Sequence, residues 1–505
     1  MKKNKINLFA VVLAAAALST SCSDEFIDKT PTAQVTEDNY YKTADDAYHA
    51  LIAVYDLMRK ESGGFENMIA MYNAGSDDFY AGGGSPSDGA GIHGFDHFTL
   101  SDSNIPRSFW GDYYQGIFRA NVFLEKLPAI EMDANLKARY MAETKALRGY
   151  YYFQLIMMFK NIPLITQTLT PEQFYNIPQA ERAAVWAQIE SDLNDAVNEA
   201  AVPNMLDMAT EAGRLSKGSM KAILGKVYLE QHKNTEAAAM LADVNGTPGG
   251  TSQYGYHLLA NYNELWNIYN KFNSESILES SHTQKSNAGW GNWGSSSDEG
   301  NTLNVMVGPR GYSAGTGAPA WETGWSFNPV TESYYNFMQG DPRFNATIAD
   351  VAALVAAGQA TYSPGDQDTG YFLKKFMPTH SDLTDGGGDV VLNYRQNTYT
   401  IRLADTYLLE AEALNGTGAR AQALLDAVRA RVGLPSIPVT PQTVLDERRR
   451  ELGGEGHRFR DLVRTGQAAT VLGPLGFVPG KSEFFPVPLL ELSNTLIVQD
   501  PAYNQ

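Results

Sequence analysis

The sequence contains one cysteine, Cys22, in 505 residues. A single cysteine cannot form an internal disulfide, so the chain is not a disulfide-stabilised scaffold. Long hydrophobic runs are also lacking: the longest, Leu8–Leu18, has eleven residues, whereas a membrane-spanning helix needs about 20. Cationic residues are scarce, with 39 Lys and Arg against 57 Asp and Glu and a net charge of -18. This balance argues against nucleic-acid binding and allows a neutral ligand.

The N-terminus has the order of an export signal. Three lysines precede the apolar run Leu8–Leu18, and small residues then lead into Cys22. We expect residues 1–21 to be a lipoprotein signal peptide. Cys22 resembles the lipobox cysteine that is acylated in bacterial lipoproteins, although Ser19 stands where a larger aliphatic residue is commoner. The alternative is an ordinary secretory leader with an incidental cysteine.

Helical periodicity dominates the chain after the leader. Apolar residues recur at helical spacing over 108–127, 138–159, 183–200 and 217–244. In the last segment Leu224, Gly225 and Tyr228, followed by Ala237 and Leu241, match the spacing of a tetratricopeptide hairpin. A similar hairpin is predicted over 403–433. These spacings favour a helical-repeat scaffold over helical hairpins of no particular family.

Two long segments, about 73–107 and 254–393, are instead rich in Gly, Ser, Asn and aromatic residues. Only 330–338 and 346–358 within them have helical patterns of any length. Their aromatic content argues against disorder, and long irregular segments in folded proteins are often functional. We therefore expect one domain over 22–505, with a helical-repeat scaffold from about 40–245 and 394–470 and a loop-rich ligand-binding part from the two irregular segments.

Several catalytic or metal-binding patterns fail in their context. "GYSAG" around Ser313 fits a serine-hydrolase elbow, with 303–307 as the possible strand, but glycine and proline follow where a helix is needed. "HGFDH" spaces His93 and His97 for a metal on a helix, but Gly91 and Gly94 favour a loop. Paired carboxylates are common in an acidic chain and do not identify a glycosidase. We expect no catalytic residues, cofactor or metal.

The C-terminal third carries the most specific motifs. These are "TIRLADTYLLEAEALNGTG", "LLDAVRARVGLP", "DERRRELGGEGHRFRDLVRTG", "FFPVPLLELSNT" and "VQDPAYNQ". With "DDAYHALIAVYDLM", "FRANVFLEKL" and "DPRF" further upstream, they closely resemble the SusD/RagB family of Bacteroidetes outer-membrane lipoproteins. The resemblance extends over essentially the whole mature chain.

This resemblance implies a mostly α fold in which tetratricopeptide-like hairpins pack against an irregular, ligand-binding part. It also implies a lipid-anchored, surface-exposed protein of the outer membrane that captures oligosaccharides for a SusC-like TonB-dependent transporter and is not an enzyme. The acidic "SDEFID" after Cys22 resembles a surface-export signal. Two alternatives stay open: a RagB-like peptide-binding protein of the same fold and a secreted hydrolase.

Tryptophans in the flexible segments suggest where a ligand binds. An indole face can cover the apolar C–H face of a pyranose. We predict an aromatic binding arc with added partners from the other irregular segment: Trp290, Trp293, Trp321, Trp325 and Tyr312, with Asp78, Phe79 and Tyr80. The alternative is that these tryptophans anchor the loops. Other residues are assigned to structure: Trp110, Trp186 and Trp266 to the core, and Glu447, Arg448, Glu451, Arg458 and Asp461 to polar contacts between helix and loop.

Overall fold

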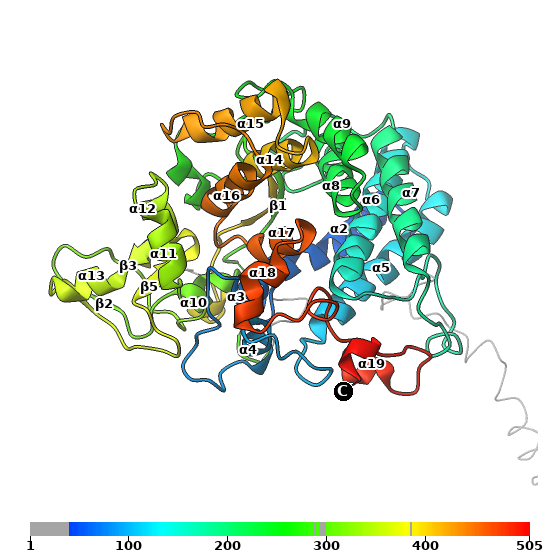
Figure 1. Cartoon of the computed structure of the whole chain (residues 1–505). Coiled ribbons are helices and arrows are strands. Elements are labelled where there is room, and N and C mark those ends of the chain that lie inside the picture. Colours follow the sequence, from blue (N-terminus) through cyan, green and yellow to red (C-terminus); the bar gives the residue numbers. More distant parts are fainter. Residues whose placement is uncertain (1–39, 286–288, 292–298, 384–385, 505) are drawn as a thin grey trace, which may run out of the picture.

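Helices are the dominant secondary structure of the computed structural model, which describes residues 40–285, 289–291, 299–383 and 386–504 (Figure 1). The predicted mostly α fold is confirmed. The α-helices are α2 (Ala44–Tyr55), α3 (Met68–Ala74), α4 (Ala90–Asp96), α5 (Ser108–Lys126), α6 (Ala134–Met158), α7 (Arg182–Asn198), α8 (Lys217–Glu230), α9 (Asn234–Asn245), α10 (Leu303–Val307), α11 (Glu332–Met338), α12 (Phe344–Thr347), α13 (Val351–Ala356), α14 (Leu403–Ala413), α15 (Gly418–Arg431), α16 (Pro441–Glu451), α17 (Arg458–Arg464), α18 (Ala468–Leu472) and α19 (Leu489–Leu492). The strands are β1 (Ser276–Ser280), β2 (Ser313–Ala314), β3 (Ile348–Asp350), β4 (Ala360–Thr361), β5 (Tyr371–Leu373) and β6 (Thr398–Arg402).

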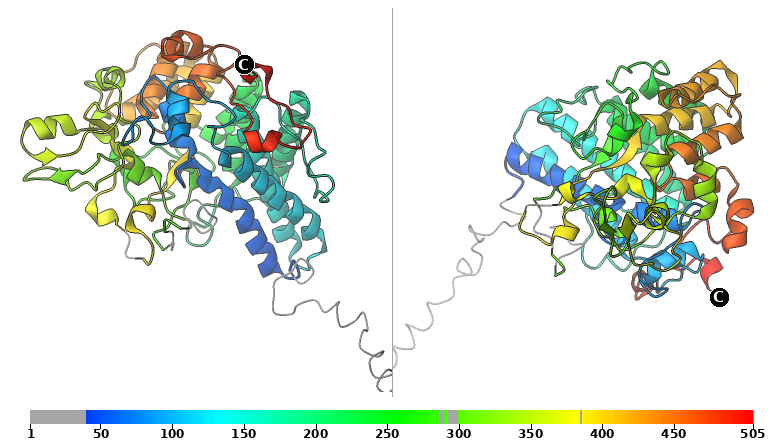
Figure 2. Two further views of the ribbon diagram at one scale, coloured as in Figure 1. Left: turned by 90° about the horizontal axis from the view of Figure 1, so that it is seen from below. Right: turned by 90° about the vertical axis from the view of Figure 1, so that its left-hand side faces the viewer.

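The long helices form a continuous stack of antiparallel neighbours. Helices α5, α6, α7, α8 and α9 each pack against the next, and α14 and α15 continue the series from α9 (Figures 1 and 2). All of them lie where the apolar periodicity predicts helices. The longest, α6, begins at the N-cap Asp133, whose side chain accepts a hydrogen bond from the Leu136 N–H at 2.9 Å.

A small residue opposite a large one explains the close packing of α8 and α9. A Cβ on Gly225 would lie 2.7 Å from Cδ2 of Leu241, so only glycine admits that leucine. Ala237 and Leu241 are fully buried in one apolar cluster with residues of α14. The contact expected of a tetratricopeptide hairpin is therefore confirmed at this pair.

The irregular segment after α9 contributes short elements that extend to one side of the molecule (Figures 1 and 2). Its strands pair antiparallel as β1–β6, β2–β4 and β3–β5. The continuous helix suggested by the pattern at 346–358 is wrong, because β3 interrupts it by pairing with β5. Asp350 then starts α13 anew by accepting a hydrogen bond from the Ala353 N–H at 2.8 Å.

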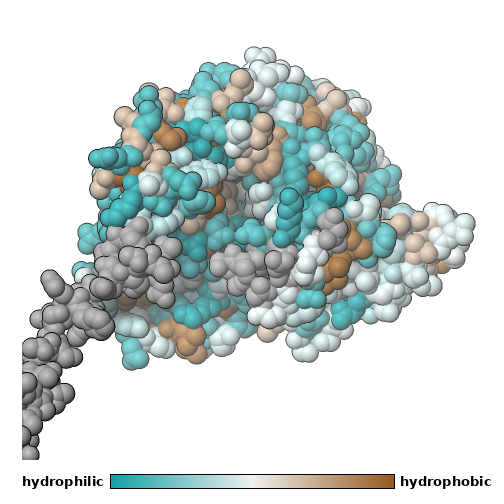
Figure 3. All heavy atoms as spheres, turned by 180° about the vertical axis from the view of Figure 1, so that it is seen from behind, coloured by the Kyte–Doolittle hydropathy of each residue, from teal (hydrophilic) through white to brown (hydrophobic). Residues whose placement is uncertain are grey.

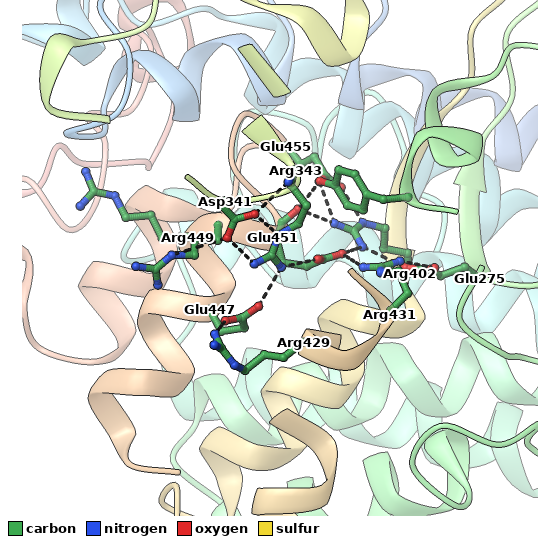
Figure 4. A network of polar contacts seen from close by, with 12 residues as sticks. Glu275, Asp341, Arg343, Arg402, Arg429, Arg431, Glu447, Arg449, Glu451 and Glu455 are labelled. Atoms are coloured by element: carbon green, nitrogen blue, oxygen red, sulfur yellow. Dashed lines mark hydrogen bonds and ion pairs between the residues drawn. The ribbon is translucent and has the colours of Figure 1, made fainter. Parts of the chain in front are cut away.

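A buried ion network joins the C-terminal helices to the irregular segment (Figure 4). At its centre, the Glu451 carboxylate accepts hydrogen bonds from Arg343 at 2.8 Å and Arg402 at 2.6 Å and also pairs with Arg431. Burial alone would raise the pKa of Glu451, but the surrounding arginines hold it well below its usual value.

The other residues assigned to polar contacts also form ion pairs with residues of other segments. Glu447 pairs with Arg343 and Arg429, Arg448 joins Asp405 to Asp461, and Arg458 binds Asp77. The structural role predicted for this set is confirmed.

The outer surface mixes polar and apolar residues. On the face seen in Figure 3, hydrophilic and intermediate residues cover most of the area and hydrophobic residues gather only in small groups. Within the described residues, no helix is both long enough and apolar enough to cross a bilayer. Trp110 is 4% exposed, and Trp186 and Trp266 are partly buried against the core, as predicted.

Candidate functional site

A cleft of about 600 Å³ opens between the N-terminal helices and the irregular segment. One wall comes from the 3-10 turn η2 (Asp56–Glu61), the loop after it and the start of α5, and the other from the tryptophan-bearing loops. The residues that line it are Arg59, Lys60, Gly63, Gly64, Phe65, Glu66, Asp88, Gly89, Ser108, Asp112, Trp290, Arg310, Trp325 and Phe327. Segments far apart in sequence thus meet at one concave surface.

Aromatic rings cover one side of the cleft. Trp290, 58% exposed, lies beside the half-buried Trp325, with ring centroids 5.9 Å apart and planes inclined by 32°. The ring centroid of Phe65 lies 6.4 Å from that of Trp325 and 5.1 Å from that of Phe327, and the rings of Phe65 and Phe327 meet edge to face. The result is an apolar surface whose outer member, Trp290, faces solvent.

The backbone around Trp325 is held firmly. The Trp325 N–H donates to the Val305 carbonyl and the Phe327 N–H to the Met306 carbonyl, both at 2.8 Å. Ser326 and Asn328 adopt left-handed φ values of 62° and 51°, which cost energy for residues other than glycine. The Asn328 side chain offsets this by donating to the Ala70 carbonyl at 3.1 Å. This hydrogen bonding orders the Trp325 wall before any ligand arrives.

Polar groups also line the cleft. The Lys60 ammonium donates to the Ser108 hydroxyl at 2.6 Å, the hydroxyl donates to Glu66 at 2.5 Å, and Asp112 lies 3.4 Å from Lys60. Burial lowers the pKa of Lys60, although Asp112 and Glu66 oppose that shift. Sugar hydroxyls both donate and accept hydrogen bonds, and this chain of groups offers both functions.

Arg310 and Asp88 complete the polar rim. Arg310 donates to the Trp325 carbonyl at 3.2 Å, while Asp88 accepts from the Gly84 N–H at 2.7 Å. In total, three carboxylates (Glu66, Asp88, Asp112) face three cations (Arg59, Lys60, Arg310) around the cleft. This balance suits a neutral ligand better than a highly charged one.

The predicted binding residues lie in several places. Trp290 and Trp325 come together in the cleft. Tyr312 and Trp321 form a separate pair, with centroids 5.7 Å apart, and neither lines the cleft. Tyr80 is half-buried and also lies outside its lining. Trp293 and Cys22, the predicted lipidation residue, lie outside the described residues.

Asp78 and Phe79 lie in the protein interior. Phe79 is 1% exposed and packs against Tyr334. Asp78 is fully buried and pairs with Arg449 at 2.5 Å, which ties the first irregular segment to α16. Neither side chain is placed to touch a ligand in the cleft, so we define the candidate site without them.

The structure corrects one prediction about the motifs, the loop at His93 and His97, and one possibility, the strand before Ser313. The "HGFDH" segment was expected in a loop, but His93 lies within helix α4 and His97 caps its end. Gly94 is tolerated there because a Cβ would lie 2.8 Å from Leu100, which packs in its place. The possible strand before Ser313 is the helix α10, and Ser313 itself lies in the exposed strand β2. The serine-hydrolase elbow is therefore not formed.

Sequence reasoning missed the polar wall and Phe65. These residues come from the end of the first helical region and the start of α5, which look like ordinary scaffold in sequence. The only local signal is "SGGFEN" (62–67), where an aromatic and an acidic residue follow two glycines. Such a short pattern carries no specific information about a ligand.

Comparison with known proteins identifies relatives over most of the chain. Residues 230–476 match the family model described as "SusD family", and residues 26–229 match "Starch-binding associating with outer membrane". A SusD-like protein of Bacteroides ovatus is 25% identical over 480 residues, covering 90% of this chain and 81% of the relative.

Solved structures are similar in fold. A structure described as a "Laminarin binding SusD-like protein" is 60% identical and has a TM-score of 0.90, with 92% of this chain and 100% of that chain covered. Surface glycan-binding protein A from Bacteroides fluxus is 25% identical with a TM-score of 0.80, again covering 92% of this chain and all of that one.

Proposed function

The chain belongs to the SusD family, and from this premise we propose that it is a glycan-binding protein of the cell surface that captures laminarin-type oligosaccharides. The observation that carries the proposal is the Trp290–Trp325 pair at the mouth of the cleft. The solved relative with 60% identity is described as laminarin-binding, which supports a neutral glucan as the ligand.

The cleft's chemistry agrees with that ligand class. Indole faces remove the apolar C–H face of a sugar from water and attract its polarised C–H bonds. Lys60, Ser108 and Glu66 then provide donors and acceptors for the hydroxyl groups. The inclined ring planes fit a glycan that curves from one residue to the next. The scaffold part positions this surface, and the loop-rich part supplies the tryptophans.

The proposal includes delivery and anchoring. Acylation at Cys22 would tether the domain to the outer membrane, and a SusC-like TonB-dependent transporter would accept the captured oligosaccharide. The protein acts without catalysis in this account, because neither Ser313 nor His93 occupies the setting that its enzymatic motif requires. No observation favours the peptide-binding alternative over the glycan.

Calorimetric titration with laminarihexaose tests the function. Trp290→Ala removes the exposed platform, and we expect a loss of about 2 kcal/mol, or roughly a 30-fold rise in Kd. Tyr175→Ala is the matched control, because Tyr175 is 61% exposed and lies outside the cleft lining. Binding of oligopeptides but not glycans would favour the peptide alternative, and hydrolysis of laminarin abolished by Ser313→Ala would favour the hydrolase.

A further inference from the structure

Helix α4 brings three metal-ligating side chains to one place. His93, Asp96 and His97 occupy positions i, i+3 and i+4, and one nitrogen or oxygen from each lies within 4.8 Å of the others. The His93 and His97 rings lie 5.9 Å apart, and Nδ1 of His97 lies 3.8 Å from the Asp96 carboxylate. We propose that these three residues form a binding site for a divalent transition-metal ion, with zinc as the best fit.

The strongest independent observation concerns His93. His93 is only 7% exposed, yet its Nε2 has no hydrogen-bond partner among the described residues. A buried polar atom without a partner is costly, and native structures rarely keep one without a reason. A cation bound at Nε2 would satisfy this atom.

Asp96 is already oriented by neighbours. Its Oδ2 accepts hydrogen bonds from the Ala81 N–H at 3.0 Å and from the Gln367 side chain at 2.7 Å. Outer partners of this kind hold a metal-binding carboxylate in position. The carboxylate therefore needs little reorganisation to become a ligand.

The donor set selects the ion. Imidazole nitrogens with one carboxylate are typical zinc ligands, and exposed His97 leaves room for water as a fourth ligand. Tetrahedral zinc with bonds of about 2.1 Å places its ligand atoms about 3.4 Å apart. The ligand atoms of His93, Asp96 and His97 lie up to 4.8 Å apart and must move closer together to bind zinc. Rotation of the exposed His97 ring provides that movement.

The bound ion would reinforce one wall of the glycan cleft. Gly89, immediately before α4, and Asp88 line the cleft, while Asp96 at the other end of α4 holds Ala81 and Gln367. A metal ion bound by His93, Asp96 and His97 would therefore stabilise both ends of the loop between residues 81 and 89. The site is separate from the tryptophan surface and does not depend on which glycan binds.

Zinc titration of the metal-stripped chain, purified without a histidine tag, tests the site. We expect one zinc ion per chain, a rise in melting temperature with added ZnCl2, and at least a tenfold weaker Kd in both His97→Ala and His93→Gln. His49→Ala is the matched control, because His49 forms an exposed i, i+4 pair with Asp45 to which the described residues add no third ligand.

His97 is 55% exposed at its side chain, so its replacement tests the ligand role with little risk to folding. Equal melting temperatures for wild type and His97→Ala in EDTA would show that the fold is intact. Visible absorption bands of tetrahedral cobalt in the wild type, lost in His97→Ala, would support the site. Absence of zinc binding, or equal weakening by His49→Ala and His97→Ala, would overturn it.

Discussion

The backbones of Gly308 and Gly324 are in direct contact, so close that a Cβ on Gly324 would lie 2.4 Å from the Cα of Gly308. The next residue after Gly324 is Trp325, whose N–H is bonded to the Val305 carbonyl at 2.8 Å. The approach of these two glycine backbones therefore sets how deeply Trp325 enters the cleft wall.

Replacing Gly324 by alanine should harm both stability and binding. The added methyl group must displace the Trp325 backbone, at a cost of about 2 kcal/mol in the free energy of unfolding. Urea denaturation measures that cost, and calorimetry should show weaker laminarihexaose binding. Gly111→Ala is the control, because Gly111 lies in α5 with nothing within 4 Å of its added Cβ. Equal stability of the two variants would contradict this account of the wall.

The two aromatic pairs should differ in their effect on binding. Trp290 and Trp325 line the cleft, whereas Trp321 packs beside Tyr312, whose hydroxyl donates to the Pro319 carbonyl at 2.9 Å. We expect Trp290→Ala to weaken glycan retention in affinity gels strongly and Trp321→Ala to leave it within about twofold. A larger loss from Trp321→Ala would move the site toward the Tyr312 pair.

The sequence predicts the scaffold well because its signals are local. Each long helix has its own apolar periodicity, and the Gly225–Leu241 contact follows from a repeat spacing. The predicted helix at 346–358 fails because pairing of β3 with β5, set by distant residues, overrides local propensity.

The cleft is predictable only in part. Trp290 and Trp325 stand out because large aromatic residues are unusual in glycine-rich loops. Phe65 cannot be found this way, because it contacts Trp325 across more than 200 residues of chain. Asp78 belongs to an acidic, aromatic stretch that looks like a binding loop, yet its carboxylate forms a buried ion pair with Arg449. Long-range contacts, rather than composition, decide which loop residues line the cleft.

The Glu451 network should be far more sensitive than a surface ion pair. Glu451→Gln leaves Arg343, Arg402 and Arg431 without their shared carboxylate in the interior, which should cost about 3–5 kcal/mol. Asp195→Asn, which breaks the more exposed Lys145–Asp195 pair, should cost about 1 kcal/mol or less. Urea unfolding of both variants gives the comparison. Similar costs would show that the network contributes no more than a surface contact.

Stability should fall in mild acid because of the buried histidine His282. Burial holds the pKa of His282 at about 4, below its unfolded value of 6.5. The neutral ring bridges two segments: Nδ1 donates to the Glu299 carbonyl at 3.2 Å, so Nε2 accepts from the Ser62 hydroxyl at 2.8 Å. As pH falls from 6.5 toward 4, the unfolded chain takes up a proton that the folded chain excludes.

This linkage favours unfolding by up to about 3 kcal/mol at pH 4 from His282 alone. His457, whose pKa burial also lowers to about 4, destabilises the fold in acid by a similar amount. The stabilisation is fully present above pH 6.5 and is lost as pH decreases. In urea unfolding at pH 7, 6 and 5, His282→Asn should start less stable at pH 7 because packing is lost. It should then lose less further stability on acidification than the wild type, since the contribution of His282 is gone while that of His457 remains. Parallel pH profiles for the two proteins would mean that the pKa of His282 is the same in the folded and the unfolded chain, which would contradict this account.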